Sequence, residues 1–135
     1  MMLLSEPTFI EALGCSMYLH QDDRALTPNV RRQGAWEPLE TEVVIRETKP
    51  GDRALDIGAN AGYYTLLLAK CVGSEGSVVA FEPEPDNLQL LEANLGLNGL
   101  TNVTVVSKAV SSASGSLPLY VSEHHKGTHS LGGPT

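Results

Sequence analysis

Between residues 53 and 121 the chain contains short apolar runs with the length and composition of β-strands. Three of these runs predict core strands at Arg53–Ile57, Ser77–Phe81 and Val103–Val106. Glycines follow the first run at once, and we interpret that run as a buried strand. A fourth and shorter strand is predicted at Leu117–Val121.

Segments with helical spacing precede and separate these runs. One helix is predicted to start at Pro38, since proline is favoured at the first helical position, and to end before Lys49-Pro50. A Leu-rich helix is predicted over Tyr63–Val72. The next starts around Glu84, where acidic residues suit the positive end of the helix dipole, and Asn98-Gly99 ends it.

The order strand, helix, strand, helix, strand predicts an α/β fold with a parallel sheet and right-handed crossovers. Ligands of such sheets bind beside the carboxyl ends of the strands. Asp56 lies near the end of the first strand, and Glu82 directly follows the second. We therefore expect both acids at the same edge of the sheet, where a ligand would bind.

The pattern divides the chain into three parts. Residues 1–35 have weak periodicity and are expected to form a peripheral N-terminal lead-in, with short strands near Ser16–Leu19. Residues 36–123 are predicted to form the ligand-binding α/β core. Residues 124–135 have no apolar periodicity and are predicted to be a loop-like tail.

Composition and charge narrow the class of protein. The 135 residues are 41% hydrophobic and 19% charged, as in ordinary globular domains. A net charge of −7 argues against nucleic acid as a partner, because such binding depends on basic residues. No apolar run approaches the ~20 residues of a membrane span, which predicts a cytoplasmic protein. Cys15 and Cys71 lack metal-ligand spacing and are interpreted as free buried thiols.

The loop after the first strand reads Asp56-Ile57-Gly58-Ala59-Asn60-Ala61-Gly62. Its glycines permit positive φ and close approach of a ligand to the backbone. A tight turn without a ligand remains an alternative. The spacing is GxxxG and differs from the GxGxxG of dinucleotide-binding loops. An acid directly before the loop would suit a cationic sulfonium ligand with an α-amino group better than a pyrophosphate.

Glu82 is the second candidate ligand-binding residue. A carboxylate at a strand end can accept hydrogen bonds from both hydroxyls of a ribose. A solvated acid or a helix cap is the alternative, and Glu82 alone favours it. Together with Asp56 and the glycines, Glu82 favours ribose binding. An equivalent acid also serves NAD, so this residue does not exclude a nicotinamide cofactor.

The chain contains, in this order, the motifs Trp36–Glu42, Lys49–Asp52, Leu55–Thr65, Ala80–Pro83, Asn94, Asn98 and Ala109–Ser111. Together these motifs resemble the FkbM-type methyltransferase family. The resemblance covers roughly residues 36–121 and implies a Rossmann-like class I methyltransferase fold with S-adenosyl-L-methionine as cofactor. The family usually methylates a hydroxyl, so the resemblance implies O-methylation of a small molecule, sugar or lipid.

The resemblance also assigns cofactor-binding residues. Asp56, Gly58, Ala59, Asn60 and Gly62 would line the methionine and ribose portion, and Glu82 would hold the ribose hydroxyls. Ser107 and Ala109, after the third strand, would flank the adenine. Two alternatives stay open, a cofactor-binding module without catalysis and, with less support, a nicotinamide-binding oxidoreductase domain.

The chain departs from the family after the third core strand. The family continues with a further strand beside Arg53–Ile57, and nothing here resembles it, so the fold is interpreted as truncated. An apolar edge left exposed by that absence is a route for self-association. No catalytic base is identified and no metal is predicted. His124, His125 and His129 are interpreted as a solvated loop in preference to a metal site or base.

Overall fold

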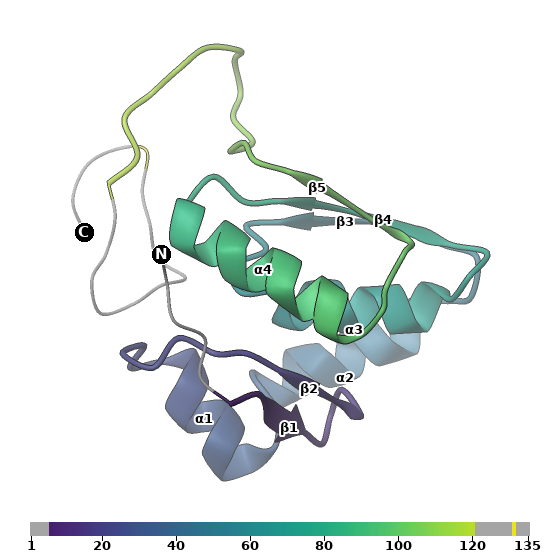
Figure 1. The fold of residues 1–135 in the computed structure, drawn as a ribbon. Helices are drawn as coiled ribbons and strands as arrows, with labels where there is room; N and C mark the ends of the chain where they lie inside the picture. The colour runs from purple at the N-terminus through teal and green to yellow at the C-terminus, as the bar shows by residue number, and fades with distance from the viewer. Residues whose placement is uncertain (1–5, 121–130, 132–135) are drawn as a thin grey trace.

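The computed structural model describes residues 6–120 and residue 131. Its elements, drawn in Figure 1, are β1 (Thr8–Ile10), β2 (Cys15–Met17), α1 (Leu26–Gln33), α2 (Pro38–Glu47), β3 (Arg53–Ile57), α3 (Tyr63–Val72), β4 (Ser77–Phe81), α4 (Pro85–Leu97) and β5 (Val103–Val106). The three core strands and the three helices predicted from the pattern are confirmed.

Strands β3, β4 and β5 form a parallel sheet in that order, as predicted. Ile57 is paired with Phe81, so β3 and β4 end at the same level. Asp56 directly precedes Ile57, and Glu82 directly follows Phe81. Both acids therefore lie at the same carboxyl edge of the sheet. Helices α3 and α4 cover one face of the sheet, and α2 packs behind α3 (Figure 1).

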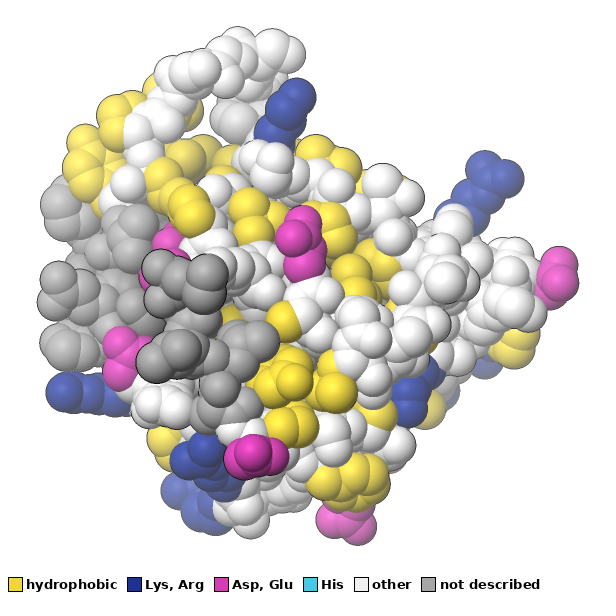
Figure 2. Space-filling view, viewed as in Figure 1, with side chains coloured by type: hydrophobic (Ala, Val, Ile, Leu, Met, Phe, Trp, Pro, Cys, Tyr) yellow, Lys and Arg dark blue, Asp and Glu magenta, His cyan; other side chains and the backbone are white. Residues whose placement is uncertain are grey.

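The two faces of the sheet differ in burial. On the face covered by helices, Val78 is 1% and Ala80 is 0% exposed. On the opposite face, Leu55 is 65% and Ile57 is 59% exposed, because no helix of the described chain covers it. The expectation that β3 is a buried strand is thus wrong for one of its faces. Figure 2 shows further hydrophobic side chains at the surface among polar ones.

The predicted fourth strand is not found in the described residues. Residues 117–119 have no regular structure, and Tyr120 forms a single bridge. Pro118 has no N–H to donate to a strand ladder, and Leu117 is 61% exposed, so this apolar run has little pairing beyond the Tyr120 bridge, and little burial, to hold it extended. Val121 and the histidines of the tail lie outside the described residues.

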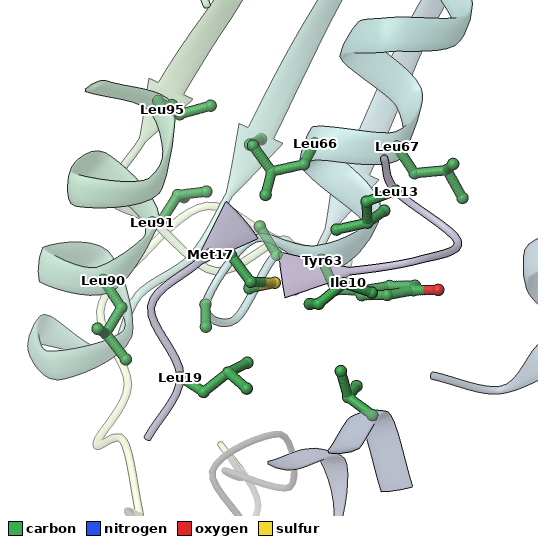
Figure 3. Close-up of a cluster of buried hydrophobic side chains, with 14 residues drawn as sticks. Ile10, Leu13, Met17, Leu19, Tyr63, Leu66, Leu67, Leu90, Leu91 and Leu95 are labelled. Atoms are coloured by element: carbon green, nitrogen blue, oxygen red, sulfur yellow. The ribbon is translucent and has the colours of Figure 1, made fainter. Parts of the chain in front are cut away.

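The N-terminal segment packs into the same hydrophobic core as the helices (Figure 3). Ile10 and Met17, from the antiparallel pair β1–β2, are fully buried beside Leu66 of α3 and Leu91 of α4. The Tyr18 amide donates to the Asn94 side chain at 2.5 Å. The sequence pattern does not predict this packing, because each three-residue strand has only one fully buried residue, too few to give a clear periodicity.

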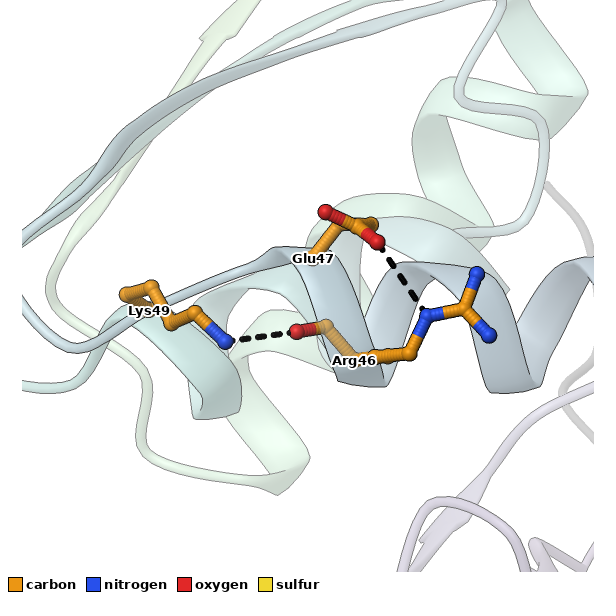
Figure 4. A network of polar contacts seen from close by, with 3 residues as sticks. All are labelled: Arg46, Glu47 and Lys49. Carbon is orange, nitrogen blue, oxygen red and sulfur yellow. Dashed lines mark hydrogen bonds and ion pairs between the residues drawn. The ribbon is translucent and has the colours of Figure 1, made fainter.

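Helix α2 buries a polar residue and exposes apolar ones. Thr41 is 3% exposed, whereas Leu39 is 76% and Val43 is 45% exposed. At its end, the Lys49 ammonium donates to the Arg46 carbonyl at 2.7 Å and so satisfies a terminal carbonyl (Figure 4). The Arg46–Glu47 ion pair beside it, at 3.1 Å, is exposed and adds little stability.

Two further expectations concern cysteines and membranes. Cys15 and Cys71 are free, as predicted, but both are half-buried. Burial raises the pKa of the Cys71 thiol, which lowers its reactivity. Among the helices that the structure describes, none is long and apolar enough to cross a membrane.

Candidate functional site

The loop of residues 58–62 leaves β3 and bends onto the end of β4. The amides of Gly58 and Ala59 both donate to the Phe81 carbonyl at 2.9 Å. Asn60 follows with a φ of 57°, a conformation that side chains other than glycine rarely adopt. Its side-chain oxygen accepts from the Ala61 amide at 2.8 Å, and such local bonding helps asparagine tolerate this conformation. The loop is therefore fixed by hydrogen bonds within the protein.

The two glycines of the loop serve different physical purposes. Gly58 has a φ of 78°, and a Cβ there would meet no atom within 4 Å. Gly62 has a φ of 106°, and a Cβ there would lie 2.8 Å from Leu91 Cδ1 on α4. Gly62 thus lets α4 pack against the start of α3, whereas Gly58 leaves open space at the edge of the sheet.

Glu82 is held in place by two backbone amides. Its Oε1 accepts from the Asn60 amide at 2.7 Å, and its Oε2 accepts from the Glu84 amide at 2.9 Å. The residue is 4% exposed, and its side chain ties the glycine loop to the segment after β4. A carboxylate has about four lone-pair positions, so each oxygen of Glu82 can accept one further hydrogen bond.

Asp56 is held by a single side chain. Thr65, in the first turn of α3, donates from Oγ1 to Asp56 Oδ2 at 2.6 Å. Burial raises the pKa of Asp56 above its ordinary value, the hydrogen bond from Thr65 acts in the opposite direction, and the negative charge of Glu82 raises it further. This effect of Glu82 on the pKa of Asp56 is what their predicted proximity at the carboxyl edge requires.

Glu37 precedes α2 in a strained conformation, with a φ of 44°. Its carboxylate accepts a hydrogen bond from the Tyr64 hydroxyl at 2.8 Å. Burial, then the hydrogen bond to Glu37 and its charge, raise the pKa of Tyr64, so this hydroxyl remains a proton donor. The neighbouring Tyr63 is buried, and its hydroxyl shares a hydrogen bond with Thr41 at 2.9 Å. The two tyrosines thereby fasten the start of α2 to the start of α3.

Ser107 and Ala109 lie in the exposed segment after β5. The Glu82 amide donates to the Val106 carbonyl at 3.1 Å, so this segment leaves the sheet next to the residue predicted to bind ribose. All eight predicted cofactor residues are thus found on β3, on its loop, or directly after β4 and β5.

Two buried polar residues of the site were not anticipated as such. Thr65 is 0% exposed and bonds Asp56, and Asn94 is 0% exposed and donates to the Ala61 carbonyl at 2.8 Å. A threonine inside an apolar helix and an asparagine on the leucine face of α4 are sequence signals for buried hydrogen bonds. Within the described residues, no group of three or more His, Cys, Asp and Glu side chains could hold a metal ion.

A parallel sheet with helices on one face and acids at its carboxyl edge defines the class of fold. Two solved structures share it with a TM-score of 0.51 and 25% identity. One is a protein-L-isoaspartate O-methyltransferase, with 56% of this chain and 24% of the other aligned. The other is a SAM-dependent O-methyltransferase from Thermotoga maritima, with 70% and 38% aligned. The fold is that of class I methyltransferases.

The family itself is identified by sequence. Residues 56–133 match the model of the methyltransferase FkbM domain, and the chain belongs to this family. S-adenosylmethionine is the methyl donor of the class, as the predicted fold and resemblance implied.

Curated relatives match part of the chain. Protein-L-isoaspartate O-methyltransferase of Methanococcus aeolicus is 37% identical over 60 residues, which is 44% of this chain and 28% of the relative. The tRNA (adenine(58)-N(1))-methyltransferase of Thermus thermophilus is 32% identical over 78 residues, which is 58% of this chain and 29% of the relative. The chain thus spans less than a third of the length of these relatives.

These relatives correct the predicted partners. One is named for a protein substrate and the other for a tRNA, so the restriction to small-molecule acceptors and the exclusion of nucleic acid are wrong. The physical reason is that a net charge of −7 averages over the whole chain, whereas recognition of an acceptor depends on a local surface.

Proposed function

We propose that this chain forms the S-adenosylmethionine-binding part of a methyltransferase that transfers a methyl group to an oxygen atom. The observation that carries the proposal is the pair of carboxylates at one sheet edge, with Glu82 fixed by backbone amides and Asp56 half-buried beside it. Two solved O-methyltransferases with the same fold support oxygen as the acceptor atom.

The residues at the edge fit this cofactor. Gly58 leaves open space where a side chain would stand, so a ligand can approach the backbone of the loop. Asp56 provides a negative charge for the α-ammonium group, and Glu82 provides one free acceptor position on each oxygen for the two ribose hydroxyls.

The remaining predicted residues have supporting roles in the proposal. Ala59 and Asn60 form the wall of the loop beside the methionine and ribose portions, and Gly62 keeps the loop against α4. Ser107 and Ala109 flank the adenine, since their segment leaves the sheet next to Glu82.

The chemistry then requires orientation more than covalent participation by the protein. When bound, the cofactor supplies an electrophilic methyl group on a sulfonium. Asp56 and Glu82 would hold the donor on either side of its sulfonium, and so align the methyl group for in-line displacement by the acceptor oxygen. The acceptor also loses a proton, and none of the described residues at this edge is assigned as its base.

Calorimetric titration of the chain with S-adenosylhomocysteine, and separately with NADH, tests the proposal. We expect S-adenosylhomocysteine to bind and NADH not to bind. Glu82→Gln keeps the size of the side chain but removes its charge, and should weaken binding roughly tenfold through the loss of a charge-assisted hydrogen bond. Glu92→Gln, an exposed substitution on α4, is the matched control.

The other outcomes have distinct meanings. Binding of NADH in place of S-adenosylhomocysteine would favour the oxidoreductase alternative. Binding that Glu82→Gln leaves unchanged would contradict the ribose assignment. Binding without methyl transfer to any oxygen acceptor would support a cofactor-binding module without catalysis.

A further inference from the structure

Thr65 makes an unusual contact for a residue inside a helix. It lies in the first turn of α3, is 0% exposed, and directs its hydroxyl across to the sheet, where Oγ1 donates to Asp56 Oδ2 at 2.6 Å. Threonine is stiff at χ1, and a fully buried threonine has little freedom to choose another rotamer. The hydroxyl is therefore preorganised as a donor toward one particular oxygen of Asp56.

The surroundings of Asp56 make this donor important. Burial disfavours the ionised carboxylate, and Glu82 at the end of β4 adds a second negative charge nearby. Among the described residues, Thr65 is the group found to favour the ionised form, and no described cation is paired with Asp56. A single neutral hydroxyl thus opposes two effects that would protonate the acid.

The hydrogen bond also distinguishes the two oxygens of Asp56. Oδ2 is occupied by Thr65, and no described donor contacts Oδ1. We propose that Thr65 is a positioning residue: it fixes Asp56 through Oδ2 and keeps the ionised Oδ1 available to a cationic ligand. This inference rests on the proposed function, in which that ligand is the α-ammonium group of the cofactor.

The test compares variants with and without the hydroxyl. Thr65→Val keeps the shape of the side chain and removes the donor, whereas Thr65→Ser keeps the donor. Titration of the Asp56 carboxyl carbon by ¹³C NMR, in the chain without ligand, reports its ionisation directly. We expect the midpoint to move to higher pH in Thr65→Val and to stay close to that of the wild-type protein in Thr65→Ser.

A binding experiment then connects this titration to the cofactor. We expect Thr65→Val to weaken the binding of S-adenosylhomocysteine about tenfold near neutral pH, the loss of one hydrogen bond to a charged group. The loss should grow as the pH falls, because more Asp56 is then protonated. Thr65→Ser should bind like the wild-type protein at every pH.

Other results would overturn the inference. If the titration midpoint of Asp56 is the same in Thr65→Val and in the wild-type protein, Thr65 does not favour the ionised form of Asp56 and the inference is wrong. A tenfold loss of affinity that does not change with pH would indicate a structural role alone. If the valine variant does not fold, Thr65→Ala lacks the same donor and the same shifts are expected of it. Failure of the wild-type chain to bind S-adenosylhomocysteine would instead contradict the proposed function, whatever the NMR midpoint.

Discussion

The ends of β3 and β4 lie side by side, yet they hold their carboxylates in different ways. At the end of β4, Glu82 accepts from two backbone amides and connects two loops. At the end of β3, Asp56 accepts from the single side chain of Thr65. The glycine loop that follows β3 is fixed by Glu82, by the Phe81 carbonyl and by packing on Leu91.

This difference indicates that Glu82 has a structural role as well as a role in binding, whereas the role of Asp56 is mainly in binding. Glu82 contributes to the structure of the edge before any ligand arrives, so a change there should affect stability and binding together. Burial and the charge of Glu82 both oppose the ionisation of Asp56, a cost to the stability of the fold. A change at Asp56 that keeps an acceptor for Thr65 should therefore affect binding without loss of stability.

The largest effect is expected from Gly62→Ala. The new methyl group would stand 2.8 Å from Leu91 Cδ1, which is fully buried, and the backbone has a φ of 106°. Overpacking and a left-handed backbone together should lower the free energy of unfolding by about 3 kcal/mol. Urea denaturation of the variant and the wild-type protein measures the loss.

Gly58→Ala is the matched control for this prediction. Its φ is 78° but its Cβ would meet no atom within 4 Å, so the cost should be confined to about 1 kcal/mol of backbone strain. Equal losses at the two glycines would contradict the distinction between a packing glycine and an open one.

A smaller loss of stability is expected from Glu82→Ala. Removal of the carboxylate leaves the amides of Asn60 and Glu84 without their acceptor and should cost about 2 kcal/mol. Glu82→Gln retains one acceptor oxygen and should lose roughly half as much. Unchanged urea midpoints for both variants would show that Glu82 has no structural role.

These structural roles mark the limit of what the sequence predicts. The order of strands and helices from Arg53 to Val106 follows from periodicity and turn residues, and the shared edge of Asp56 and Glu82 follows from the parallel order. The hydrogen bond from Thr65 to Asp56 and the contact between Gly62 and Leu91 depend on how α3 and α4 pack on the sheet. No local pattern encodes that packing.

The wrong predictions of a fourth strand and of a fully buried β3 have the same cause, since both depend on packing between distant elements. The run at Leu117–Tyr120 has strand composition without a neighbouring strand among the described residues. Leu55 and Ile57 have buried-strand composition on a face that no described helix covers. Apolar composition reports a preference for burial, whereas a partner element in space decides whether burial occurs.

A further test concerns the pH dependence of stability at Asp56. Because its pKa is raised in the folded protein, its contribution to stability is full at pH below 3.8 and is lost as the pH rises through the raised pKa. Asp56→Asn removes this loss and keeps an acceptor for Thr65. The variant should thus gain stability relative to the wild-type protein as the pH rises toward neutrality.

Thermal unfolding at several pH values measures this gain, with the exposed substitution Glu92→Gln as the control that should show none. The same Asp56→Asn variant should bind S-adenosylhomocysteine more weakly. If Asp56→Asn instead loses both stability and affinity at neutral pH, Asp56 has a structural role like that of Glu82, and the proposed difference between the two strand ends is wrong.

The smallest effect is expected from Tyr64→Phe. The Tyr64 hydroxyl donates to Glu37, which is exposed, so loss of this bond should cost about 0.5 kcal/mol. Thr41→Val, which removes the buried partner of Tyr63, should cost more. Urea denaturation measures the loss of stability in the two variants. A larger loss in Tyr64→Phe than in Thr41→Val would contradict the view that the Thr41–Tyr63 hydrogen bond is the stronger of the two.

The most direct test of the central claim is an amide NMR titration of the labelled chain with S-adenosylhomocysteine. The account predicts dispersed resonances, with shifts concentrated at Gly58, Asn60 and Glu82 and at Ser107 after β5. Dispersed resonances that do not move at saturating ligand would contradict it, because a folded carboxyl edge would then lack affinity for the cofactor.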